Sequence, residues 1–230
     1  MEPLPVAYMT TLLHLPLSPY CRKVRVVLGE LKVPFALEEE PVWERREAFI
    51  ALNPAGTVPV LLLDDGRALA ESQAIVEYLE ETAEAPMLLD AGPVTRAEIR
   101  RLTLWFDAKF ASEVTDYLYR ERIMKRLAGH GPPNSEFVRA GVLNLEQHLR
   151  YIDMLLSERH WLAGDHFSLA DVAAGAHLSS LDYMGAISWA DHPTAYEWYA
   201  RFKSRPSVRP LLSDRVPGWR PAPHYADLDF

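Results

Sequence analysis

The spacing of apolar and polar positions divides this chain into a mixed N-terminal part and a C-terminal part that is helical. Short apolar runs predict strands at residues 11–15, 35–37, 60–63 and 68–70. Apolar residues at helical spacing predict helices around Val24–Leu31 and from Ser72. A polar helix is expected over Glu44–Leu52, bounded by Asn53-Pro54, because the residue before a proline is disfavoured in a helix. Asp64-Asp65-Gly66 is a turn signal between the last two strands. The predicted order over residues 9–81 is therefore βαβαββα.

The rest of the chain divides into three segments. The periodicity breaks at residues 82–93, which we interpret as a linker. Residues 94–205 repeat helical patterns, and Thr95-x-x-Glu98 and Ser168-x-x-Asp171 predict capping boxes at two helix starts. The first of these helices would extend to about Leu127, a length for which we expect a bend. Further helices are expected up to Leu156 and near Thr194–Lys203, and five prolines exclude a continuous helix from residues 206–230.

Composition narrows the classes of function. The net charge of −8 argues against a nucleic-acid partner, which would require a clustered basic surface. A single cysteine excludes an intrachain disulfide and a multi-cysteine metal site, and no histidine spacing indicates a metal. No apolar run is long enough for a membrane span, and the N-terminus is a poor signal peptide. We expect a cytoplasmic protein; Met1 and Met9 are both possible starts.

Four motifs, in this order and spacing, resemble the cytosolic glutathione transferases. They are SPYC at the first helix, NPAGTVPVL at 53–61, ESQAIVEYL at 71–79 and FSLAD at 167–171. The resemblance spans nearly the whole chain. It implies an α/β plus all-α fold, with a thioredoxin-like domain over residues 9–81 followed by an all-helical domain over residues 94–205.

The same resemblance implies a glutathione site. Ser18 occupies the position from which serine-type transferases donate a hydrogen bond to the glutathione sulfur, which would stabilise the thiolate. Val58 would precede a cis Pro59, and Glu71-Ser72 would hold a carboxylate at a helix N-terminus. No cofactor is required, and glutathione would be a ligand or a substrate. Local physics explains Ser18 and Ser72 equally well as helix caps, with Pro19 in the first turn.

The only cysteine, Cys21, bears on a rival thiol chemistry. SPYC resembles the Cys-Pro-Tyr-Cys of glutaredoxins, but Ser18 replaces the nucleophilic cysteine. A dithiol mechanism is therefore excluded. Cys21 should lie in the first turn of its helix as a packed, unreactive thiol.

Two segments are candidates for partner binding. Trp43 lies in a polar connection, where a large aromatic side chain requires either its own core or another chain. The tail PGWRPAPHYADLDF either packs back across both domains or acts as a recognition element. Its candidate contact residues are Trp219, Tyr225, Asp227, Asp229 and Phe230.

This tail and SPYCRKVRVVLGEL are together similar to a narrower group, the glutathione-transferase-like division proteins of alphaproteobacteria that bind the tubulin-like protein FtsZ. That resemblance implies a homodimer, recruited to the division site, that binds FtsZ filaments and alters their curvature to support constriction. The alternative is a serine-type glutathione S-transferase that conjugates glutathione to electrophiles or reduces peroxides. Whether the protein is an enzyme stays open at this point.

Overall fold

The computed structural model describes residues 9–85, 87–89 and 92–228. Four short strands form one mixed sheet in the order β2-β1-β3-β4. β1 (Thr11–His14) pairs in parallel with β2 (Ala36–Glu39) and antiparallel with β3 (Val60–Leu62). β4 (Ala68–Ala70) completes the hairpin with β3. The predicted βαβαββα order is confirmed, with strand ends shifted by one or two residues.

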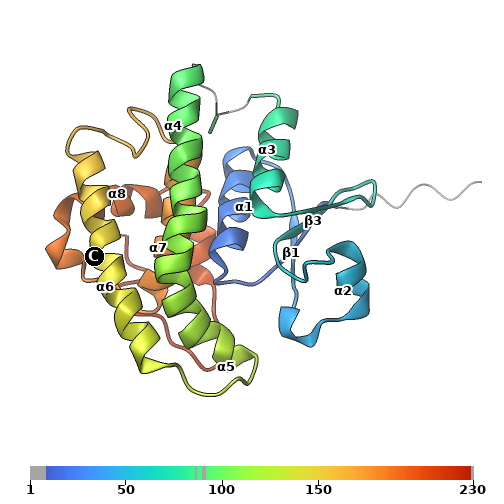
Figure 1. The fold of residues 1–230 in the computed structure, drawn as a ribbon. Coiled ribbons are helices and arrows are strands. Elements are labelled where there is room, and N and C mark those ends of the chain that lie inside the picture. The colour runs from blue at the N-terminus through green and yellow to red at the C-terminus, as the bar shows by residue number, and fades with distance from the viewer. Residues whose placement is uncertain (1–8, 86, 90–91, 229–230) are drawn as a thin grey trace, which may run out of the picture.

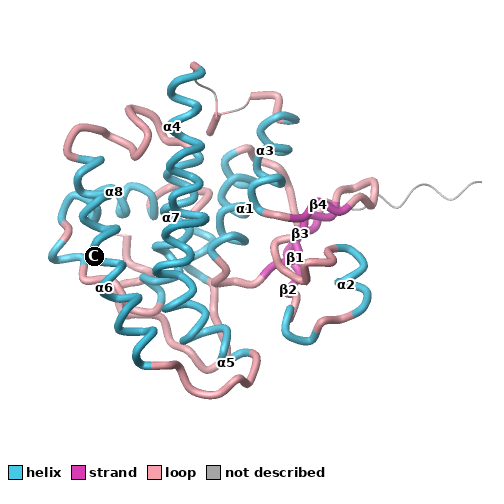
Figure 2. The backbone as a smooth tube through the Cα atoms, viewed as in Figure 1, coloured by secondary structure: helices cyan, strands magenta, loops and turns pink. Residues whose placement is uncertain are grey.

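Helices cover both faces of this sheet (Figures 1 and 2). α1 (Pro19–Glu30) and α3 (Ser72–Thr82) pack on the face that carries Leu12 and Leu61, towards the helical domain. α2 (Glu47–Leu52) covers the opposite face, where Phe49 packs with Leu13 and Val60. This division follows from strand geometry, because successive side chains point to opposite faces.

The helical domain begins with a continuous helical stretch that stands in the middle of Figure 1. α4 (Pro93–Leu104) continues into a π-helical segment, η2 (Trp105–Met124), and ends as α5 (Lys125–Leu127). Within this segment the backbone bonds to the fifth residue back, as where the Lys125 amide donates to the Arg120 carbonyl. A bend was expected in this helix. The structure shows instead a change from α-helical to π-helical hydrogen bonding over Trp105–Met124.

The remaining helices surround a buried central helix. α7 (Leu169–Tyr183) is buried along its whole length and packs against α1, η2 and α4. α6 (Ser135–Leu156) lies along η2, and α8 (Pro193–Lys203) packs against α6. Two short 3₁₀ helices follow, η3 (Trp189–Asp191) before α8 and η4 (Arg209–Ser213) after it. None of the helices described is long and apolar enough to cross a membrane.

Capping was predicted correctly at two helices and incorrectly at two others. Ser18 caps α1, and Ser168 with Asp171 forms the expected capping box of α7. Thr95 does not cap α4, which begins two residues earlier after Gly92. Ser72 is the first residue of α3 and not its cap, because Glu71 takes the cap position.

The predicted helix over residues 44–52 was also too long. It is divided into a 3₁₀ turn, η1 (Val42–Glu44), and α2 from Glu47. Arg45 separates them with a φ of 49°, in the left-handed region that ends a helix. The Asn53-Pro54 signal marks where this helix ends, and it carries no information about a change of conformation at one residue near the start.

Candidate functional site

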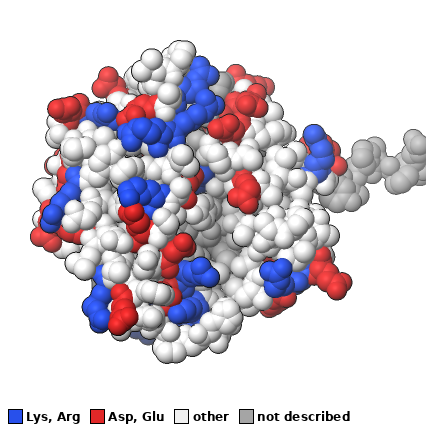
Figure 3. Space-filling view, in the orientation of Figure 1, with Lys and Arg blue, Asp and Glu red and all other residues white. Residues whose placement is uncertain are grey.

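A pocket of about 350 Å³ opens between the two domains, on the face where Figure 3 shows the molecule hollowed. The N-terminal domain supplies most of its wall, and the π-helical segment supplies one residue. Its lining residues are Tyr20, Thr57, Val58, Pro59, Glu71, Ser72, Gln73 and Asp107. Four of the five residues predicted for a glutathione site therefore lie together here. The exception is Ser18.

The turn before β3 and the start of α3 form one side of the pocket. The Val58–Pro59 peptide bond is cis, as predicted, and Pro59 is buried. Glu71 has a φ of 70°, an unusual conformation for a residue with a side chain, and it is exposed. Ser72 is buried at the first position of α3, where unpaired amides and the helix dipole favour an anion.

The hydroxyl of Ser18 is used inside the protein. It accepts a hydrogen bond from the Cys21 amide at 3.4 Å, and the residue is only 6% exposed. The residue of this motif that lines the pocket is Tyr20, two positions after Ser18. Its hydroxyl donates to the backbone carbonyl of Asp107 at 3.1 Å. Tyr20 belongs to the SPYC motif, but the sequence alone indicated no role for it.

Acidic residues affect the pKa of the Tyr20 hydroxyl. Burial is the main cause that raises the pKa of Tyr20, and Asp107, Asp116 and Glu71 raise it further. None of the lining residues is a lysine, arginine or histidine. Asp116 and Glu71 would also disfavour another anion beside Tyr20, such as a ligand thiolate, whereas the Asp107 carboxylate is paired with Lys23.

A buried charged network lies beneath the pocket and joins the domains. The Lys23 ammonium, which is fully buried, donates to the Asp107 carboxylate and to Gln73 Oε1, the latter at 3.3 Å. His177 Nε2 lies 3.4 Å from Asp107 Oδ1. Burial raises the pKa of Asp107, but His177 and Lys23 outweigh it and lower the pKa overall. Sequence reasoning missed Asp107 because it lies 84 residues from Lys23, on another domain.

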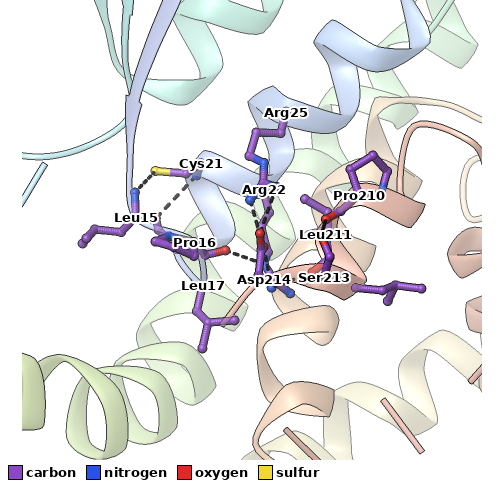
Figure 4. Close-up of polar contacts among 12 residues, drawn as sticks. Leu15, Pro16, Leu17, Cys21, Arg22, Arg25, Pro210, Leu211, Ser213 and Asp214 are labelled. Atoms are coloured by element: carbon purple, nitrogen blue, oxygen red, sulfur yellow. Dashed lines mark hydrogen bonds and ion pairs between the residues drawn. The ribbon is translucent and has the colours of Figure 1, made fainter. Parts of the chain in front are cut away.

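Cys21 has the properties of an inert thiol. Its side chain is fully buried, and burial raises its pKa to about 11. Its sulfur accepts a hydrogen bond from the Leu15 amide at 3.5 Å (Figure 4). Because the thiolate is the reactive form, this environment opposes both nucleophilic attack and metal binding.

The opposite side of α1 holds the C-terminal segment (Figure 4). Arg25 makes a two-point contact with Asp214, at 2.8 and 3.0 Å. Arg22 reaches the same carboxylate at 3.0 Å and also donates to the Pro16 carbonyl and to Ser179 Oγ. α1 therefore presents Tyr20 to the pocket on one side, and Arg22 and Arg25 to the C-terminal segment on the other.

The tail packs back on the helical domain and reaches α1, where the Arg22 guanidinium lies 5.8 Å from the centre of the Tyr225 ring. Tyr225 is fully buried, donates to the Leu211 carbonyl at 3.0 Å and packs edge-on against Tyr183. This corrects the expectation that Tyr225 contacts a partner. Further along, His224 Nε2 lies 2.9 Å from the buried Asp182 carboxylate, and Lys203 donates to the Asp227 carbonyl.

The other candidate partner residues are more accessible. Trp43, in η1, and Trp219, in the tail, are both half-buried, and Asp227 is exposed. Asp229 and Phe230 lie outside the described residues.

Comparisons with known proteins agree with this geometry. Residues 12–87 match the family model for the glutathione S-transferase N-terminal domain, and residues 135–201 match the model for the C-terminal domain. The chain belongs to the glutathione S-transferase family. It is 48% identical over 223 residues, 96% of this chain and 98% of the relative, to FtsZ-localized protein A from Caulobacter vibrioides.

Two solved structures are similar over nearly their full length. The structure of FzlA from C. crescentus has a TM-score of 0.93 and 47% identity, covering 97% of this chain and all of that one. A structure named as a glutathione S-transferase from Rhodospirillum rubrum F11 has a TM-score of 0.94 and 50% identity, covering 96% of this chain and all of that one. Fold similarity therefore does not separate the two functional hypotheses.

Proposed function

We propose that this protein is a cell-division scaffold: a homodimer with the glutathione S-transferase fold that localises with FtsZ, binds FtsZ filaments and modulates their curvature and constriction. The observation that carries the proposal is the 48% identity to FtsZ-localized protein A, which extends over 96% of this chain. A two-fold dimer presents two identical surfaces, so it can bridge or bend a polymer through avidity without any chemical step.

The pocket supports a scaffold more than an enzyme. Ser18 is 6% exposed, does not line the pocket and caps α1. The hydroxyl that does line it, Tyr20, is bonded to the Asp107 carbonyl and lies among carboxylates. A transferase gains rate by stabilising a thiolate, and none of the residues that line the pocket is a lysine, arginine or histidine.

The accessible candidate contacts support the same proposal. Asp227 is exposed, and the backbone of its segment is held in place because Lys203 donates to the Asp227 carbonyl and His224 contacts Asp182. Trp43 and Trp219 each leave part of a large aromatic surface accessible. Aromatic side chains of this kind are enriched among the residues that dominate binding energy at protein interfaces.

A serine-type glutathione S-transferase is the second candidate. It is favoured by the positions of Val58, Pro59, Glu71 and Ser72, which together line one pocket. Under this proposal the Ser18 hydroxyl would keep accepting from the Cys21 amide and would donate its own proton to the glutathione sulfur. The residues that cover it would have to move, because Ser18 is 6% exposed and does not line the pocket. Replacing Ser18 with alanine would then reduce conjugation about 10²-fold, as the loss of one positioned donor does.

Co-sedimentation with purified FtsZ polymers tests the scaffold proposal, with filament curvature measured by electron microscopy. Wild type and Ser18→Ala should bind alike, and Asp227→Lys should lose binding while remaining folded. Glu158→Lys is the matched control, an exposed acid on another part of the surface. If Asp227→Lys binds as well as wild type, the tail is not the surface that contacts FtsZ. If wild type does not bind, the proposal is overturned.

Calorimetric titration with glutathione to about 10 mM, followed by an assay with an electrophile, tests the enzyme. A dissociation constant near or below about 1 mM with Ser18-dependent turnover would establish it. Absence of both binding and turnover would leave SPYC as a helix start alone.

A further inference from the structure

A second concave surface lies at the sheet edge, away from the interdomain pocket. It is a groove of about 210 Å³ between β2, α1 and the segment after α8. Its lining residues are Arg25, Gly29, Phe35, Leu37, Pro206, Ser207, Pro210 and Leu211. Leu37, on β2, is 44% exposed, a large fraction for a leucine on a strand. No role assigned above uses this groove.

The strand that borders the groove has an open edge. β2 pairs with β1 on one side, and no described strand pairs with its other side. The amides of Ala36 and Glu40 donate to the β1 side, to the carbonyls of Thr10 and His14 at 2.9 and 3.0 Å. Backbone groups alternate along a strand, so the N–H and C=O groups of Leu37 and Glu39 point to the open edge.

Hydrogen bonds to Glu30 hold the far wall of the groove against α1. Glu30, at the end of α1, accepts two hydrogen bonds from Arg205, both at 2.7 Å, and one from Ser207. At Gly29 the two walls meet so closely that a Cβ there would lie 2.9 Å from Ser207 Cβ. A preformed groove reduces the entropic cost of binding.

We propose that this edge binds an extended segment of a partner protein as a fifth strand, with one bulky apolar side chain in the groove and basic residues beside it. An added strand places alternate side chains on the face of Leu37, so one of them reaches the groove between Leu37 and Pro210. Glu38 and Glu39 are both exposed on the edge strand, so lysine or arginine in the partner segment complements them. This inference does not depend on FtsZ being the partner.

Two different roles for the same edge lead to different expected results. A four-residue strand with consecutive glutamates is also how proteins protect an edge from pairing. Alternatively, the edge of a second copy of this chain covers it, in which case it is a subunit interface. The groove beside the edge favours a partner segment, because edge protection does not require a preformed apolar cavity.

The test uses a fluorescein-labelled peptide Lys-Val-Lys-Leu-Lys-Val-Lys and the full-length protein. Fluorescence anisotropy should give a dissociation constant below about 1 mM, and Leu37→Asp should raise it at least about tenfold. Leu143→Asp, which alters a 69% exposed leucine on α6, should leave it within about twofold. A double Glu38→Lys, Glu39→Lys variant keeps the groove and should also weaken binding.

Backbone pairing has its own signature. Bound peptide should slow hydrogen exchange at the Leu37 and Glu39 amides, and the same peptide N-methylated on alternate residues should not bind. The proposal is overturned if the peptide does not bind, if Leu37→Asp and the glutamate reversals leave binding unchanged, or if the N-methylated peptide binds equally well. It is also overturned if Leu37→Asp without peptide changes the oligomeric state in sedimentation, because the edge is then a subunit interface.

Discussion

Arg25 and Asp214 form a two-point ion pair that joins α1 to the C-terminal segment, with Nη1–Oδ2 and Nη2–Oδ1 distances of 2.8 and 3.0 Å. The same carboxylate also receives the buried Arg22, so one aspartate compensates two guanidinium groups. Charges that are removed from water are tolerated only when they are paired and hydrogen-bonded. The tail is therefore part of the folded unit, and its first half is a structural element.

Asp214→Asn should destabilise the protein strongly. Two buried cations lose their counter-charge, and breaking a buried pair from one side costs about 3–5 kcal/mol. Chemical denaturation should show this loss in the free energy of unfolding. The matched control is Asp65→Asn, which breaks an exposed aspartate–arginine pair with Arg67 and should change the free energy of unfolding far less. Similar losses in the two variants would contradict this description of Asp214.

Ser18→Ala should reduce stability through the helix cap. The serine hydroxyl accepts from the Cys21 amide, and replacing a capping serine with alanine costs about 1 kcal/mol. Ser18→Asn restores a capping acceptor without a buried charge, so it should recover most of the loss. The measurement is the free energy of unfolding. An unchanged value for Ser18→Ala would show that the 3.4 Å contact contributes nothing.

Cys21 should resist alkylation in the native protein. Its pKa of about 11 leaves very little thiolate at neutral pH, and the side chain is fully buried. We expect labelling by a thiol reagent to be at least about 10²-fold slower in the folded protein than in urea. A comparable rate in both states would show that α1 opens readily, and would restore a reactive thiol to consideration.

His192 should make stability depend on pH. Its ring lies between Asp153 Oδ2, at 2.6 Å, and Glu146 Oε2, at 3.0 Å. Burial lowers the pKa of His192, but hydrogen bonds to Glu146 and Asp153 outweigh it and raise the pKa above the ordinary 6.5. A raised pKa means that the folded state binds the proton more tightly, so this stabilisation is complete below pH 6.5 and is lost as pH rises through the folded pKa.

The measurement is the difference in free energy of unfolding between wild type and His192→Gln as a function of pH. The difference should be largest at acidic pH and decrease towards alkaline pH. Comparing the two proteins at each pH cancels the titration of groups that they share. A difference that is constant with pH, or that grows as pH rises, would reverse the assigned sign.

Gly175→Ala should destabilise the protein although alanine is the better helix former. A Cβ at this position of α7 would lie 2.4 Å from the Phe202 ring, and overpacking of a core costs about 1–3 kcal/mol. Intrinsic helix propensity alone predicts a gain of about 1 kcal/mol, so the sign of the change decides between the two effects. In the double variant Gly175→Ala, Phe202→Leu, the loss should be less than the sum of the two single losses.

Much of the fold was predictable because its signals are local. Apolar periodicity located the strands and most helices, Asp-Gly marked the hairpin turn, and Ser18 and Ser168 marked two helix starts. The wrong prediction of a capping box at Thr95 arose because Glu98 makes other contacts in the folded protein. Glu98 of the expected capping box pairs instead with Arg101 and Arg159, the latter 61 residues away, and the helix begins at Pro93, after Gly92.

Within the candidate site, the residues that could be predicted are those that belong to the motifs resembling the family. Val58, Pro59, Glu71 and Ser72 lie in the motifs that resembled the family, and all four line the pocket. Asp107 was not predictable, because it contributes to the pocket from the other domain. Tyr225 was expected on the surface because aromatic residues among prolines resemble a recognition segment, whereas the fold buries it against Tyr183.

The sequence by itself therefore determined the order of elements, the division into two domains and the residues that begin several helices, because these depend on spacing and on groups within a few positions. The tertiary structure alone decided which hydroxyl faces the pocket, which carboxylates surround it and which part of the tail is core. Those properties depend on contacts such as Lys23 with Asp107 and Arg25 with Asp214, whose energies come from desolvation and charge pairing between segments 84 and 189 residues apart.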